Sequence, residues 1–439
     1  MKSDLIYKLE DRPPFKDAFF AAFQHLLAIF VGIITPPLIV ANALQLDMQH
    51  TSFLISMSLF ASGVATFIQC RRFGFCGCGL LCVQGTSFSF IGPIIATGLV
   101  GGLPLIFGSC MAAAPVEMIV SRTFKYLRKI ITPIVSGTVV LLIGLSLIKV
   151  GVISCGGGQA AIKAGTFGNW QNLTIAAVVL LSVLFFNRSG NKYLRMSSII
   201  LGLILGYLVA FYFGKVDTSG LSTSNLLSFN IPMPFKYGLS VSFSSVIGLG
   251  LVYLITAIEA TGDITANSMI SGLPVEGEEY MKRVSGGVFS DGLNSFISGI
   301  FNTFPNSIFA QNNGIIQLTG VASRYVGYYI AGFLVLLGLF PIVGVVFSIM
   351  PDAVLGGATV LMFGTVASAG IRIISSQQIG RKETLVIAVS LALGLGVELV
   401  PNILVNAPQT VKTIFSSGIT TGGLAAILSN ILIQIKEKD

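Results

Sequence analysis

Long apolar segments alternate with short polar ones along almost the whole chain. Seven apolar segments occupy the first half, a more polar stretch runs from Lys215 to Tyr237, and seven further segments follow. Most of them approach the roughly 20 residues that an α-helix needs to cross a bilayer. The pattern predicts an all-α polytopic membrane protein with fourteen spans, near residues 18–40, 51–69, 80–97, 102–121, 131–150, 171–187, 196–213, 241–262, 285–303, 306–318, 324–345, 353–371, 383–400 and 410–434.

The basic residues support this count because they alternate from one connection to the next. If the N-terminus is cytoplasmic, the expected outer segments hold only five of the 26 Lys and Arg residues: Lys149, Lys163, Lys215, Lys236 and Lys412. The other 21 fall on the expected inner side, as the bias of Lys and Arg toward the cytoplasm requires. We therefore expect both termini in the cytoplasm and a multi-pass protein of the cell membrane, in bacteria the inner membrane.

Composition excludes most other classes of protein. Of the 439 residues, 53% are hydrophobic and 10% are charged, whereas soluble domains carry about 25% charged residues. The net charge of +8 fits the topology bias, so we expect membrane lipid and no nucleic acid as a partner. Four of the six cysteines lie between Cys70 and Cys82 in a Gly- and Leu-rich run. That setting favours packed thiols over a metal site, and we expect no metal.

The two halves of the chain resemble each other. The segment 137–144 aligns with 357–364 at an offset of 220 residues, and the same offset pairs Ser87 with Ser307. Because seven is odd, a second seven-span unit enters the membrane from the opposite side. The alignment predicts an inverted repeat, which is typical of secondary transporters; coincidence among Gly- and Val-rich helices is the alternative.

Two segments at matching places in the halves are unlike ordinary spanning helices. One covers 84–93 and reads Gln-Gly-Thr-Ser-Phe-Ser-Phe-Ile-Gly-Pro; the other covers 304–314 and reads Phe-Pro-Asn-Ser-Ile-Phe-Ala-Gln-Asn-Asn-Gly. Each begins with polar residues and is apolar for only half a membrane width. Such interrupted helices expose backbone groups at membrane depth, which is tolerated where they line a cavity. A pair of kinked helices is the simpler interpretation.

Acidic residues inside spans are the strongest functional signal, because burying a charge at the centre of a span costs about 2.5–3.5 kcal/mol. Glu259 and Asp263 share one face of the eighth span, and Asp291 lies in the ninth. The alternatives are a helix end for the first two and a structural hydrogen bond for Asp291. Glu117 is nearer a span end, and we expect it to be structural.

Three further titratable residues carry weaker signals. We expect Asp352 and Glu398, at outer ends of spans, to be solvated. His25 lies about a third of the way into the first span, where packing and a functional role are both open. There is no phosphate-binding loop of the G-x-x-x-x-G-K-[ST] type and no catalytic motif such as H-E-x-x-H or G-x-S-x-G. We therefore expect a transporter with no catalytic residues, not an enzyme.

The segment 311–327 reads Gln-Asn-Asn-Gly-Ile-Ile-Gln-Leu-Thr-Gly-Val-Ala-Ser-Arg-Tyr-Val-Gly and resembles the signature of the nucleobase–ascorbate (nucleobase–cation symporter) transporters. Gln24-His25, the run Ser87-Phe-Ser-Phe, the three span acids and the N-terminal Leu-Glu-Asp-Arg-Pro-Pro at 9–14 support the resemblance, which is strongest to the bacterial xanthine permeases. It covers nearly the whole chain.

The resemblance implies a fold of two inverted seven-span repeats in which spans 3 and 10 begin as short antiparallel β-strands. It also implies a core domain (1–125 and 239–346) that moves like an elevator against a gate domain (126–238 and 347–439). Members of the family act as homodimers, here through the gate domain. The energy source is the proton gradient, and no cofactor is implied.

The resemblance also implies the site residues. Glu259 matches the carboxylate that binds the nucleobase ring, and Gln311 the amide that reads its other edge. Phe88 and Ser87 match positions that border the ligand. Asn312 and Asp263 match supporting neighbours. Asp291 matches an acid needed for function, and His25 a residue that tunes affinity. At the position of Ser87, some xanthine-selective members have Asn.

The residues themselves agree with a purine-dione ligand. Such a ring carries N–H donors and carbonyl acceptors along its edges; a carboxylate accepts the former, and an amide offers both kinds of group. We expect import of a purine nucleobase, xanthine foremost, with a proton on Asp291 or on the Glu259–Asp263 pair. The alternatives are a urate or uracil-type permease, or an anion transporter of the same architecture.

Overall fold

The computed structural model describes residues 5–127, 132–191, 194–195, 197–216, 231–375, 377–408, 411–412, 415 and 417–433, and almost every element in them is a helix. The first half contains α1 (Phe15–Leu44), α2 (Met48–Arg71), β1 (Gln84–Thr86), the 3-10 helix η1 (Phe88–Phe90), α3 (Ile91–Ala113), α4 (Pro115–Leu127), α5 (Pro133–Cys155), α6 (Gly158–Lys163), α7 (Trp170–Asn187) and α9 (Ser198–Tyr212). The second contains α11 (Phe243–Ile270), α12 (Gly277–Ile300), β2 (Asn306–Ile308), α13 (Gln311–Thr319), α14 (Arg324–Leu339), α15 (Pro341–Ser348), α16 (Asp352–Ser375), α17 (Arg381–Leu399), the 3-10 helix η2 (Pro401–Leu404) and α19 (Gly418–Leu432).

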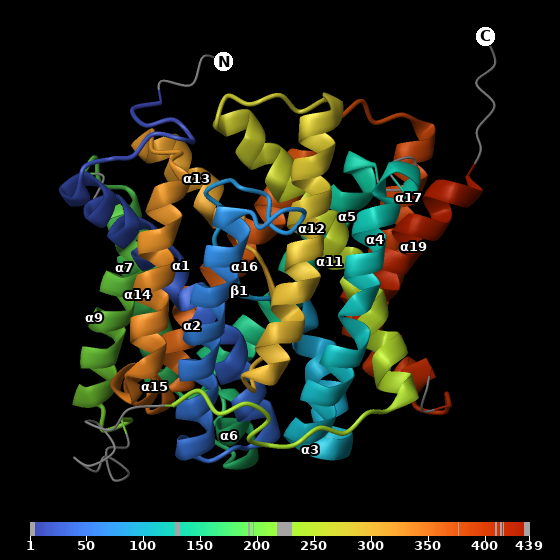
Figure 1. The fold of residues 1–439 in the computed structure, drawn as a ribbon. Coiled ribbons are helices and arrows are strands. Elements are labelled where there is room, and N and C mark those ends of the chain that lie inside the picture. The colour runs from blue at the N-terminus through green and yellow to red at the C-terminus, as the bar shows by residue number, and fades with distance from the viewer. Residues whose placement is uncertain are drawn as a thin grey trace.

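Many of these helices are long and apolar enough to cross a bilayer. Within the described residues there are seven candidate spans of at least 18 residues, and three shorter apolar helices, α9, α14 and α19, accompany them. The protein is therefore a multi-pass membrane protein. In Figure 1 the start of α1 and the end of α19 lie at the same end of the bundle, which requires an even number of crossings.

The structure corrects several expected boundaries. The break expected between the third and fourth spans lies at Gly101 and Gly102, whose backbone angles are not helical, so α3 is two helices joined at a kink, and the second ends at Ala113 before α4 begins. The segment 324–345 is two helices, because α14 ends before Phe340, which has extended backbone angles, and α15 starts at Pro341. The short helix α6 was not expected. Of the polar stretch from Lys215 to Tyr237, positions 217–230 lie outside the described residues.

The two expected strands are present, and they pair with each other. β1 and β2 run antiparallel, with Gly85 opposite Ser307 at the centre, and each is followed by a helix. Gly85 is required here because a Cβ would lie 2.5 Å from the Phe309 ring and 2.8 Å from Ile33. The strands therefore cross deep inside the bundle and leave the starts of η1–α3 and of α13 facing the interior.

The helices form two packed groups. In one, α1 to α4 pack with α11, α12, α14 and α15; in the other, α5, α7 and α9 pack with α16, α17 and α19. Contacts of α11 with α5 and α19 join the groups. Gly202 and Gly206 bring α9 close to Val183 and Val179 of α7, inside the second group.

The tightest helix pair is α5 and α16, which run antiparallel. Gly137, Gly144 and Gly151 are spaced by seven residues on α5, and they face Ile374, Ala367 and Val360 of α16 in turn. A Cβ on Gly144 would lie 2.3 Å from the backbone nitrogen of Ala367. Without a side chain at these positions the two backbones approach closely, as small residues permit in membrane helices.

Candidate functional site: the crossing of the two strands

Buried polar atoms without partners gather around the strand pair. Ser87 Oγ, Thr86 Oγ1 and both side-chain atoms of Asn306 are buried and make no hydrogen bond within the described part of the chain. An unpaired buried polar group costs about 1–3 kcal/mol. The region can therefore accommodate a polar ligand or water, and Ser87 belongs to it.

Glu259 faces this region from the middle of α11. Its Oε2 accepts a hydrogen bond of 3.1 Å from the hydroxyl of Ser89, which is 1% exposed. Glu259 itself is half-buried, so its carboxylate keeps acceptor capacity for a second donor. Thr256 and Asp263 lie one turn away on either side of Glu259. Glu259 is thus in the interior of a helix, which removes the interpretation as a helix end.

Phe88 forms the junction between the strand crossing and the second helix group. It is partly buried, and its ring packs edge-on against Phe363 of α16, with the ring centroids 5.3 Å apart. A flat aromatic face of this kind suits a planar ring. Phe88 therefore lies between the two helix groups at the position that the resemblance gives it.

The first turn of α13 is anchored by its asparagines. Asn313 accepts a 2.8 Å hydrogen bond from Asn267 and donates one of 3.3 Å to the backbone oxygen of Asp263. Asn312 donates to the backbone oxygen of Leu81, just before β1. These bonds hold Gln311, the first residue of α13, beside α11 at the end of β2.

His25 and Asp263 lie behind this turn. His25 is fully buried on α1, faces the Asn312 amide, and neither ring nitrogen has a hydrogen bond among the described residues. The half-buried Asp263 likewise leaves Oδ2 without a partner in the described ranges. His25 and Asp263 both lie near the hydrogen bonds that position α13, and neither forms an ion pair with another described residue.

Asp291 is joined to β1 by a buried hydrogen bond. The Nε2 amide of Gln84 donates to Asp291 Oδ1 at 2.6 Å, and both side chains are fully buried. This bond links the first residue of the strand crossing to the middle of α12. Asp291 therefore makes the structural bond that we considered as the alternative, and its other oxygen remains unpaired among the residues described.

Asp352 and Glu398, which we expected to be solvated, also take part in hydrogen bonds. Asp352 accepts a 2.6 Å hydrogen bond from Asn42 of α1, and Glu398 accepts one of 3.1 Å from the backbone of Gly418. Both side chains are only partly exposed. They join neighbouring elements in the outer part of the bundle.

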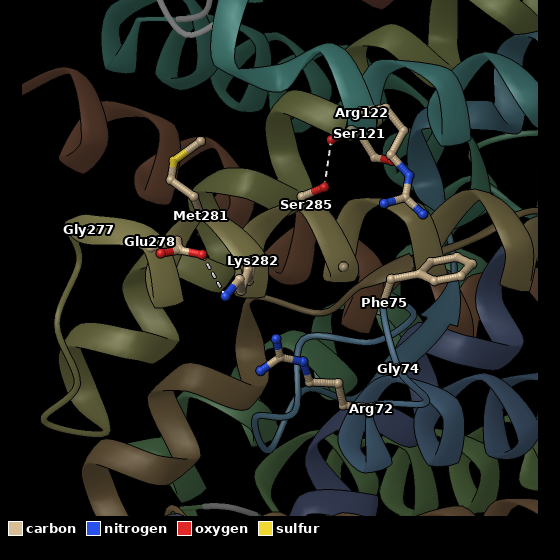
Figure 2. A pocket seen from close by; sticks show the side chains of 11 residues that line it. Arg72, Gly74, Phe75, Ser121, Arg122, Gly277, Glu278, Met281, Lys282 and Ser285 are labelled. Atoms are coloured by element: carbon tan, nitrogen blue, oxygen red, sulfur yellow. Dashed lines mark hydrogen bonds and ion pairs between the residues drawn. The ribbon is translucent and has the colours of Figure 1, made fainter.

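A pocket of about 830 Å³ opens at one end of the first helix group. Figure 2 shows its basic side chains Arg72, Arg122 and Lys282 together with Glu278 and the hydrogen-bonded pair of Ser121 and Ser285. The three basic residues come from three connections that we expected on the same side of the membrane. Their gathering in one pocket agrees with the alternation of basic residues along the chain.

Two residues that bond to the site acids, and one further buried acid, were not identified from the sequence. Ser89 and Gln84 lie in the interrupted segment 84–93, but nothing in the pattern shows which of its polar side chains meet α11 and α12. Glu117, which we expected to be structural at a span end, is fully buried, with both carboxyl oxygens unpaired among the described residues. The signal in the sequence that Glu117 is unusual is that it is a single acid within an apolar stretch.

The chain matches the Permease family model Xan_ur_permease over residues 16–403. It belongs to the nucleobase–ascorbate transporter family. Among curated relatives, it is 50% identical to the xanthine permease XanP of Escherichia coli (strain K12), over 98% of this chain and 95% of that protein. It is 49% identical to XanQ of the same organism, over 98% and 94%. It is also 36% identical to the nucleobase transporter PlUacP of Paenibacillus larvae, over 95% and 94%.

Solved structures extend the likeness of the fold beyond the family. The transmembrane domain of the cyanobacterial bicarbonate transporter BicA superposes with a TM-score of 0.58 at 13% identity, over 97% of this chain and all of that one. The murine anion transporter Slc26a9 in its inward-facing state gives 0.60 at 11% identity, over 97% and 69%. This family member therefore has the fold of the seven-plus-seven inverted-repeat transporters.

Proposed function

We propose that the protein imports a purine nucleobase, with xanthine as the principal substrate, together with protons. The observation that carries the proposal is the carboxylate of Glu259 in the middle of α11, held by Ser89 beside unpaired polar groups of the strand crossing. The family and the xanthine permeases at 49–50% identity support the substrate class.

The donors and acceptors of the site suit a purine-dione. Glu259 accepts from ring N–H groups, and the Gln311 amide both donates to a carbonyl and accepts from an N–H. The rings of Phe88 and Phe363 cover one side of the ligand. A ring that lacks the matching groups leaves buried polar atoms unpaired and is rejected.

A substrate-competition panel tests the assignment. In cells without other purine carriers, uptake of labelled xanthine should fall with excess xanthine and remain with excess uracil or sulfate. Urate and hypoxanthine define the breadth of the purine preference. Competition by sulfate alone would favour an anion transporter of the same fold, and Glu259→Gln should abolish uptake while the protein stays in the membrane.

The mechanism that we propose is an elevator movement across fourteen spans. The first packed helix group, with β1, β2 and α13, forms a core, and the second forms a gate through which two copies of the chain associate. The core consists of residues 1–125 and 239–346, and the gate consists of residues 126–238 and 347–439. Residues 128–131, just after the first boundary, lie outside the described residues. The separate packing of the two groups supports this division.

We place both termini in the cytoplasm. The pocket with Arg72, Arg122 and Lys282 would then face the cytoplasm, as the bias of basic residues favours. A cysteine introduced at Glu278 should react with a membrane-impermeant thiol reagent only from inside, and one at Thr166, in the exposed α6–α7 connection, only from outside. The reverse pattern would place the termini outside.

Proton coupling follows from carboxylates in the membrane interior. A carboxylate that moves with the core through an apolar gate is costly unless it binds a proton. Uptake of xanthine into proteoliposomes should therefore rise with an inward proton gradient. Dependence on sodium without dependence on protons would refute this coupling. The proton gradient is the only energy source proposed, and no cofactor or metal takes part.

A further inference from the structure

Glu117 is a buried acid that the binding site does not use. It lies near the start of α4, is fully buried, and neither carboxyl oxygen has a hydrogen bond among the described residues. Asp291, the neighbour of Gly292 on α12, lies across the contact between α4 and α12 and interacts electrostatically with Glu117. The packing is close at this point, since a Cβ on Gly292 would lie 3.1 Å from Glu117 Cβ.

Among the described residues, the groups that act on the two acids include no positive charge. The carboxyl group of Glu117 also interacts electrostatically with Glu259 and with the hydroxyl of Thr256. The carboxyl group of Asp291 interacts with Glu259 and with the Gln84 amide. None of these groups is basic. The acids that face the pair from α11 are Glu259 and Asp263, and the phenol of Tyr253 is the other titratable neighbour.

Two facing carboxyl groups in a dry interior are both acceptors when ionised, so they can bond to each other only through a proton. Gln84 supports the same conclusion independently. It is fully buried and gives its amide N–H to Asp291, while its Oε1 has no partner among the described residues. This second unsatisfied acceptor beside the pair indicates that a donor is missing.

The structure also provides a short route from the pair to water. Ser121 lies one helical turn along α4 from Glu117, and its backbone oxygen accepts a hydrogen bond of 2.7 Å from the hydroxyl of Ser285. Both serines line the basic pocket of about 830 Å³ (Figure 2). A proton that leaves the carboxyl pair therefore has one turn of α4 to cross before it reaches a pocket open to solvent.

We infer that Glu117 and Asp291 together hold the coupling proton, and that this proton is exchanged through the pocket lined by Ser121 and Ser285. The inference rests on the proposed proton symport and identifies the group that carries the proton. In the loaded state one carboxyl is protonated and donates to the other. When the proton leaves, water from the pocket solvates the two carboxylates.

The test uses purified full-length protein in proteoliposomes that contain a trapped pH indicator. Two quantities are measured: the proton entry that accompanies xanthine entry, and the exchange of labelled for unlabelled xanthine at equal pH on both sides. Glu117→Gln keeps the shape of the side chain but cannot ionise, so it should lose xanthine-coupled proton entry and retain exchange. Glu117→Asp should restore part of the coupling.

Glu278→Gln is the matched control, because Glu278 is an exposed glutamate at the rim of the same pocket, paired with Lys282. It should couple protons as the wild type does. Proton entry with each xanthine in Glu117→Gln would overturn the inference while leaving proton symport intact. A wild type that moves xanthine without protons, or with sodium instead, would refute the symport itself.

A measurement on the wild type covers the case in which Glu117→Gln does not fold. The infrared spectrum should contain the carbonyl-stretch band of a buried protonated carboxyl group, and this band should vanish at alkaline pH. Isotope editing at glutamate should shift part of it. A wild-type spectrum without such a band at any pH overturns the inference.

Discussion

The hydroxyl of Ser89 donates a hydrogen bond of 3.1 Å to Glu259 Oε2, and the two residues are 170 positions apart in the chain. This contact joins the helix that follows strand β1 to the centre of α11. It fixes the carboxylate at the strand crossing, and it is the only hydrogen bond to the Glu259 side chain among the described residues.

Removing the Ser89 hydroxyl should weaken xanthine binding. A hydrogen bond to a charged group contributes about 1.5–3 kcal/mol, so Ser89→Ala should raise the KM for xanthine roughly tenfold, with a smaller effect on the maximal rate. The measurement is initial uptake over a range of xanthine concentrations. Ser429→Ala removes a buried hydroxyl that bonds only within α19, and it should leave the KM unchanged.

Gln84 should be needed for both stability and transport. In Gln84→Leu the Oδ1 of Asp291 loses its 2.6 Å donor, and an unsatisfied buried acceptor costs about 1–3 kcal/mol. We expect a lower melting temperature in detergent and a loss of xanthine uptake. Gln84→Glu tests the role of the amide separately, because it keeps the size of the side chain and replaces the amide N–H donor with a carboxylate oxygen. Full activity in both variants would contradict the role assigned to this bond.

Two glycines at matching places in the two halves of the chain should respond differently to substitution by alanine, because their packing differs. Gly144 and Gly364 occupy matching places in the halves, but a Cβ on Gly144 would meet the Ala367 backbone at 2.3 Å, whereas Gly364 has nothing within 4 Å. Gly144→Ala should lower the melting temperature markedly by separating α5 from α16. Gly364→Ala should be neutral or stabilising, by up to about 1 kcal/mol of helix propensity. Equal melting temperatures for the two variants would argue against the tight helix contact.

Asp47 should stabilise the protein only when it is ionised. It lies between α1 and α2, outside the membrane helices, where hydrogen bonds from His50 lower its pKa and where it caps α2. Because the folded-state pKa is lowered, the stabilisation is present above the unfolded value of about 3.9 and is lost as the pH falls through the folded one.

Asp47→Ala should therefore cost about 0.5–2 kcal/mol at neutral pH, the usual range for an N-cap, and almost nothing in strong acid. Thermal unfolding at both pH values measures this difference. Asp47→Asn keeps a capping oxygen without the charge and should recover only a small part of the loss at neutral pH. A cost that does not change with pH would show that the charge has no part in it.

The helical membrane architecture could be predicted because it depends on local pattern. Apolar length indicates the helices, and an acid such as Glu259 inside an apolar run is visible by itself. The helix break at Phe340 and the contact of Asp352 with Asn42 could not be predicted, because they depend on which distant element lies opposite. Glu117 shows the limit most clearly. Its position near a span end suggested a structural role, but the sequence does not show that α12 covers it on the side of Asp291.

The pairing of β1 with β2 also has a consequence for biosynthesis. The partner of Gly85 is Ser307, so the ribosome must add more than two hundred residues before the edge of β1 can be paired. Until then, the polar backbone of the strand and the side chain of Gln84 lie at membrane depth without their final partners, at a cost that lipid cannot relieve. Maturation of the transport pathway is therefore a late step of insertion. A nascent chain stopped before residue 306 should remain bound to the insertion machinery.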